Sequence, residues 1–217
     1  MNPADNLLIW DPQTIIRPPV STMSRFLLSL PVFRTQGGCL VSFSDHHSEL
    51  DPTLRRMFGA LVERAFIQTM GVYEPGVTDY LAGVLTDFAH FQNVYKVRDL
   101  QGKPLHEVAD MLMQADIRLD APSFNREREV HKHIGDFTLF WAGVYPEALK
   151  GMHSRWRKDH LLDYVQQGRN SYAIAATHDY GEYREQAPVL KKLSDEFELC
   201  LYGLSLVRGD IDGMARA

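Results

Sequence analysis

The sequence has few of the patterns from which a function is usually assigned. It has only two cysteines, Cys39 and Cys200, and neither belongs to a Cys-x-x-Cys pair, which excludes a zinc ribbon. It has no glycine-rich phosphate-binding loop and no Gly-x-Ser-x-Gly nucleophile motif. The two could form one disulfide, but nothing requires it, and we expect two buried free thiols in a reducing compartment. Candidate sites must therefore come from residue spacing alone.

Long apolar runs are also missing from the sequence. No stretch approaches the roughly 20 apolar residues that are needed to cross a bilayer. The first residues lack the basic start of a signal peptide. The net charge of −5 argues against a nucleic-acid role. Together these observations predict a cytoplasmic protein that has neither a membrane nor a nucleic-acid partner.

What the sequence does have is 217 residues of ordinary globular composition, with 45% hydrophobic and 24% charged residues. No Gly/Ser-rich or Pro-rich linker divides it. Residues 1–47 contain five prolines, which discourage long helices. We expect these residues to form an extended, irregular arm, with a short helix over 24–30 and a short strand over 39–43. The arm should pack on a single helical domain of residues 48–217.

Helical periodicity dominates after residue 50, where apolar residues recur at spacings of three and four. Capping residues and prolines mark the starts of the predicted helices. We expect helices over residues 51–71, 78–95, 104–115, 123–148, 158–183 and 188–207, with Pro146 bending or ending the fourth. Short connections favour antiparallel neighbours. The predicted fold is all-α, an irregular antiparallel bundle of about six helices with an extended N-terminal arm.

The central predicted helix carries the main candidate site. At about 100° per residue, Glu129, His133 and Asp136 form one row beside the apolar face. Carboxylates and an imidazole on one row suit a metal ion or an acid–base pair. The row also has a structural explanation, because carboxylate–His pairs at i,i+4 are common helix contacts and Arg126 can pair with Glu129.

Two further acid–His pairs extend the metal hypothesis. Asp87 and His90 are three residues apart, and His178 and Glu182 are four apart. If the three pairs converged, they would supply oxygen and nitrogen ligands for iron, manganese or zinc. His131 lies about 200° around the helix from His133, so we expect it to stay outside such a site.

Two classes of function remain open. The first is a non-catalytic interaction or scaffold protein that binds a protein partner or self-associates. It rests on the absence of a catalytic motif and on the many apolar residues, and it predicts an exposed apolar surface. The second is a metal-binding or small-ligand-binding bundle, which predicts that the acid–His pairs converge in one pocket. We favour the first.

Overall fold

A computed structural model describes residues 47–115, 124–152, 159 and 162–216. Within these ranges it contains nine α-helices and no strand, which confirms the predicted all-α bundle. The predicted arm, with its helix over 24–30 and its strand over 39–43, lies outside the described residues except for His47, which is helical. Among the helices of the described part, none is both long and apolar enough to cross a membrane.

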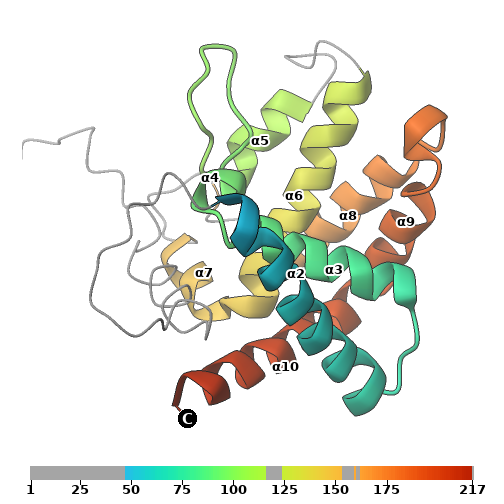
Figure 1. The fold of residues 1–217 in the computed structure, drawn as a ribbon. Helices are drawn as coiled ribbons and strands as arrows, with labels where there is room; N and C mark the ends of the chain where they lie inside the picture. Colours follow the sequence, from blue (N-terminus) through green and yellow to red (C-terminus); the bar gives the residue numbers. More distant parts are fainter. Residues whose placement is uncertain (1–46, 116–123, 153–158, 160–161, 217) are drawn as a thin grey trace, which may run out of the picture.

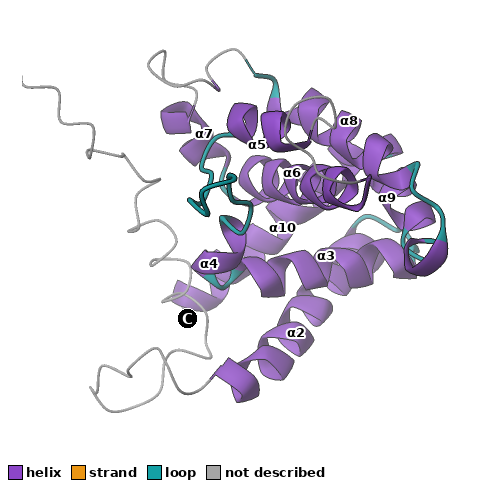
Figure 2. Ribbon diagram, turned by 90° about the horizontal axis from the view of Figure 1, so that it is seen from above, coloured by secondary structure: helices purple, strands orange, loops and turns teal. Residues whose placement is uncertain are grey.

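One long central helix organises the bundle. Figure 2 shows α6 (Phe124–Val144) nearly end-on, with other helices arranged around it. Figure 1 shows the chain order. Before α6 come α2 (His47–Glu63), the π-helix η2 (Arg64–Thr69), α3 (Pro75–Phe88), α4 (Phe91–Val94) and α5 (Val108–Ala115). After it come α7 (Pro146–Met152), α8 (Tyr164–Ala176), the 3-10 turn η4 (Gly181–Tyr183), α9 (Ala187–Asp195) and α10 (Phe197–Arg216).

The apolar face of α6 forms the centre of the core. Its predicted inward residues, among them Ile134, Phe137 and Trp141, are fully buried. Pro146 ends α6 as predicted, because α6 stops at Val144 and α7 begins at the proline. The flank of α6 is buried as well, since α3, α5, α8 and α10 all pack against it. The predicted row of polar residues therefore points largely into the protein.

The helices α6 and α8 run antiparallel and approach each other closely. His131 lies beside Ser171, whereas further along α6 Thr138 lies beside Gly168. A Cβ atom on Gly168 would come within 2.4 Å of both the Thr138 hydroxyl oxygen and the Phe197 ring. The glycine is thus required by the packing of the two helices.

Some predicted helix boundaries are wrong because capping carboxylates set them. The helix predicted over 104–115 begins only at Val108, where the backbone N–H groups of Val108 and Ala109 donate to the Asp159 carboxylate at 2.8 and 2.9 Å. The helix predicted over 158–183 shrinks to α8. Its start is fixed by Asp163, whose side chain accepts two backbone N–H bonds of the first turn.

Other predicted helices are divided. The helix predicted over 78–95 becomes α3 and α4, because His90 has an extended backbone and the Asn93 amide donates to the Asp87 carbonyl at 3.0 Å. The helix predicted over 188–207 becomes α9 and α10, with a break at Glu196. The helix predicted over 51–71 starts already at His47 and ends in the π-helix η2. The helices are more numerous than predicted, but the fold class is unchanged.

Candidate functional site

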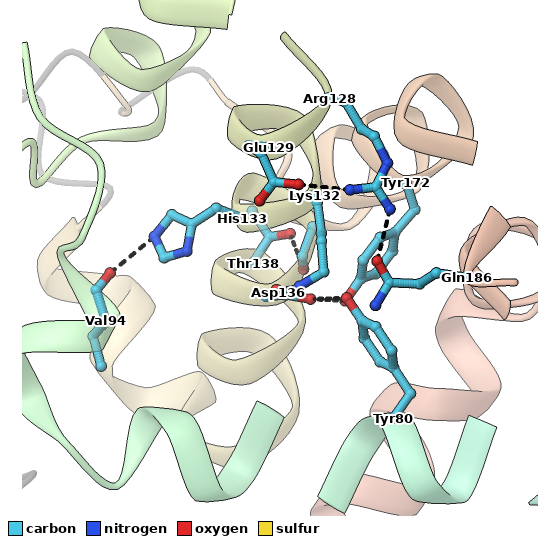
Figure 3. Close-up of polar contacts among 11 residues, drawn as sticks. Tyr80, Val94, Arg128, Glu129, Lys132, His133, Asp136, Thr138, Tyr172 and Gln186 are labelled. Atoms are coloured by element: carbon cyan, nitrogen blue, oxygen red, sulfur yellow. Dashed lines mark hydrogen bonds and ion pairs between the residues drawn. The ribbon is translucent and has the colours of Figure 1, made fainter. Parts of the chain in front are cut away.

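The predicted row on α6 leads to Asp136, whose carboxylate lies between three helices (Figure 3). The hydroxyls of Tyr80 on α3 and Tyr172 on α8 donate to Asp136 Oδ1 at 2.6 and 2.8 Å. Lys132, one turn earlier on α6, donates to Oδ2 at 3.0 Å. Asp136 is only 3% exposed. The carboxylate therefore joins α3, α6 and α8 through donors that all come from the protein itself.

The pKa values of the groups in this cluster are shifted away from neutral pH. Burial by itself raises the pKa of Asp136, but the Lys132 ammonium and the Tyr80 hydroxyl outweigh burial and hold this pKa below its usual range. Burial, followed by the charge of Asp136, raises the pKa of Tyr80 and Tyr172 well above the usual value. The site therefore holds one ammonium–carboxylate pair and two neutral phenols.

Lys132 pairs with Asp136, one of the carboxylates that the sequence predicts as metal ligands. Burial lowers the pKa of Lys132, but the nearby charges of Asp136, Glu129 and Asp87 together raise it above its usual value. The ammonium is thus a resident cation that neutralises Asp136. Sequence reasoning missed this role, although the i,i+4 spacing of Lys132 and Asp136 could have suggested it.

Glu129 is held by Arg128 rather than by Arg126. Arg128 Nη1 donates to Glu129 Oε1 at 2.6 Å, and Nη2 donates to the Gln186 side-chain oxygen at 2.7 Å (Figure 3). The guanidinium also lies 3.8 Å from the centre of the Tyr183 ring. The Arg128 side chain is 2% exposed and that of Glu129 is 49% exposed. Glu129 therefore compensates a buried charge.

His133 is fully buried and connects α6 with the end of α4. Its Nε2 lies 3.1 Å from the Val94 carbonyl oxygen, which assigns the ring proton to Nε2 and leaves Nδ1 without a partner. Burial, and then the nearby charge of Lys96, lowers the pKa of His133 to about 4. The imidazole is neutral at neutral pH and donates a structural hydrogen bond.

The remaining predicted residues do not join this row as ligands. Asp87 is exposed on α3, and His90 precedes the first turn of α4. His178 faces Glu127, with 3.7 Å between its Nε2 and the carboxylate, whereas Glu182 is exposed on η4. In the described ranges, no group of three His, Cys, Asp or Glu residues could hold a metal ion. The predicted metal site stays a prediction without support from this geometry.

A shallow hollow of about 550 Å³ lies between α8 and α9. Its lining consists of small apolar side chains with a few charged ones: Ala173, Ala176, Thr177, Asp179, Arg184, Ala187, Pro188 and Lys191. None of the predicted site residues lines it. The hollow and the Asp136 cluster are separate features of the fold.

An ordered turn precedes α5 and presents an apolar side chain. Arg98 and Pro104 form an isolated bridge, and the Asp99 carboxylate accepts two backbone N–H bonds within the turn at 3.0 and 2.8 Å. Leu100 in this turn is 68% exposed. Arg126, in the first turn of α6, donates to the Arg98 carbonyl at 2.9 Å. The turn is therefore attached to the start of α6.

Two other exposed apolar side chains lie at the same helix start. Phe124, the first residue of α6, is 65% exposed, and Tyr180, which follows α8, is 46% exposed. The Tyr180 hydroxyl lies 3.4 Å from Oδ1 of Asn125. We call Leu100, Phe124 and Tyr180 the α6-start surface. Figure 1 shows the turn before α5, the start of α6 and the end of α8 at the same end of the bundle.

No family model, no curated protein and no solved structure matches the chain.

Proposed function

We propose that this chain is a non-catalytic interaction protein that binds a protein partner, or a second copy of itself, through the α6-start surface. One observation carries the proposal. Three separate ordered segments present Leu100, Phe124 and Tyr180 to solvent around one helix start. Large apolar side chains that are exposed on ordered backbone at one end of a fold support a protein-binding surface there.

The predicted catalytic row supports the same proposal. A general acid or base needs an accessible group that titrates near the working pH. Asp136 instead accepts three internal hydrogen bonds, and His133 stays neutral while its ring faces the Val94 carbonyl. The row is better suited to holding helices together than to chemistry on a substrate.

Serine substitutions at the surface test the proposal. We expect a triple variant, Leu100→Ser with Phe124→Ser and Tyr180→Ser, to weaken self-association or partner binding at least about tenfold, which equals about 1.4 kcal/mol. The matched control is Tyr73→Ser with Tyr202→Ser, since these side chains are 74% and 57% exposed elsewhere. Sedimentation over a wide concentration range and quantitative cross-linking provide the measurement. The proposal is contradicted if the chain stays monomeric and no partner binds the wild type more tightly than the triple variant.

The metal-binding alternative has weaker support, because the described residues offer no three-ligand group. Elemental analysis of the untagged full chain distinguishes the two functions. Stoichiometric iron, manganese or zinc that is lost on His133→Ala would favour the metal function over the interaction function.

We also propose a reducing, cytoplasmic setting for the protein. Cys200 is a buried free thiol, and burial raises its pKa to about 12. A buried thiol of this kind behaves as a small apolar side chain and needs no oxidising compartment.

A further inference from the structure

The sequence before the described helices contains a basic and strongly apolar segment. Residues 12–44 include Arg17, Arg25 and Arg34 but no aspartate or glutamate. Within them, residues 24–34 read Ser-Arg-Phe-Leu-Leu-Ser-Leu-Pro-Val-Phe-Arg. This stretch combines two arginines with six large apolar side chains. Burial against an apolar surface that carries negative charge would therefore be favourable for it.

The Tyr180 side of the α6-start surface is apolar and carries negative charge. Arg184 is the one lysine or arginine in residues 177–186. On the opposite side, Arg98 and Arg126 donate to backbone carbonyls. Four carboxylates that are exposed or partly exposed lie on the Tyr180 side: Glu127, Asp179, Glu182 and Glu185.

The segment is long enough to reach this surface. The described chain begins at His47, which is 13 residues after Arg34. Thirteen extended residues span about 43 Å at about 3.3 Å per residue. A compact domain of this size is about 40 Å across. A chain must run over the surface, where the path to the opposite face is about 63 Å, so residues 24–34 of the same molecule reach the faces on the His47 half of the bundle and part of the far half.

We propose that residues 24–34 bind the α6-start surface of their own molecule and cover it until a partner displaces them. This inference rests on the proposed function, because it names the regulation of that same surface. The apolar residues of the segment cover Phe124 and Tyr180, and Arg25 and Arg34 face the carboxylates. A tether of this length keeps the local concentration of the segment near the millimolar range, so even a weak contact is occupied.

Disulfide trapping in the full chain tests the contact. Cys39→Ser removes the native thiol of the N-terminal region. The second native thiol, Cys200, is buried and unreactive. In this background, Ser29→Cys is combined with Asn125→Cys, an exposed position next to Phe124 and near the Tyr180 hydroxyl. The matched control combines Ser29→Cys with Ser205→Cys, an exposed position on α10. We expect the intramolecular disulfide with position 125 to form at least tenfold faster than with position 205.

Charge reversal gives a second measurement on the same chain. Arg25→Glu with Arg34→Glu should slow trapping at position 125 several-fold, whereas Arg17→Glu, outside the segment, should not. Equal trapping rates at positions 125 and 205, or no effect of charge reversal, would overturn the proposal. A disulfide between two molecules would also overturn it and would identify the second copy as the occupant. Partner binding that depends on the α6-start surface, without trapping, would leave the proposed function intact.

Discussion

The ammonium of Lys132 lies 3.0 Å from Oδ2 of Asp136, at the place where the sequence predicts a divalent metal ion. The two residues are one turn apart on α6, and their side chains are 18% and 4% exposed. Two tyrosine hydroxyls from α3 and α8 complete the contacts of the carboxylate. Asp136 therefore links α3, α6 and α8 through the two tyrosines, and Lys132 neutralises its charge.

Asp136→Asn should destabilise the protein by about 3 kcal/mol, because it leaves the Lys132 ammonium without its charged partner in a largely buried place. Urea denaturation of the full chain at neutral pH measures this loss. The control is Asp79→Asn, which removes a 79% exposed carboxylate that pairs with Arg55. The control should cost less than about 1 kcal/mol. Equal losses in the two variants would contradict the role of Asp136.

His131 and His133 should make stability fall as the pH drops below 6.5. Burial lowers the pKa of each to about 4, with smaller contributions from His178 and Lys96 respectively, against an ordinary value of 6.5. Between these values the unfolded chain binds protons that the folded chain does not. Each histidine therefore removes about 1.4 kcal/mol of stability per pH unit.

Urea midpoints measured between about pH 7 and about pH 4.5 check this dependence. The double variant His131→Gln with His133→Gln should show a flatter curve, because glutamine does not titrate. A curve with the wild-type slope would contradict the assignment of the two histidines.

Gly168→Ala should destabilise the protein by about 1–3 kcal/mol, although alanine favours a helix by up to about 1 kcal/mol. The new methyl group would meet Thr138 and Phe197 at 2.4 Å. Gly209→Ala on α10 is the matched control, since nothing lies within 4 Å of its Cβ position. The control should stabilise slightly. Thermal unfolding of both variants measures the difference, and shifts of the same sign would contradict the close packing of α6 and α8.

Asp159→Ala should destabilise the protein by about 1–2 kcal/mol and should loosen α5 more than any other helix. The carboxylate accepts the first backbone N–H groups of α5, and it also accepts the Tyr164 hydroxyl at 2.6 Å. Hydrogen exchange should become faster in residues 108–115. The control, Asp163→Ala, removes the cap of α8 and should accelerate exchange in residues 164–176 instead. If the same helix showed the largest acceleration in both variants, these cap assignments would be contradicted.

Local sequence patterns were sufficient to predict the fold class and the apolar face of the central helix. Ile134 and Trp141 are fully buried as predicted, because helical periodicity is a property of residues a few positions apart. Pro146 ended α6 for a similarly local reason, since its ring and its missing N–H act within one turn. The start of α5 was wrong because its cap, Asp159, lies about 50 residues away in the sequence.

The sequence by itself determined that Glu129, His133 and Asp136 share one flank of one helix. Only the tertiary structure decided what that flank meets. Tyr80 and Tyr172 reach Asp136 from positions 56 and 36 residues away, and no pattern within a few residues encodes such contacts. The direction of a side chain on a helix follows from the local backbone, whereas the partners of a buried polar group follow from how distant helices pack.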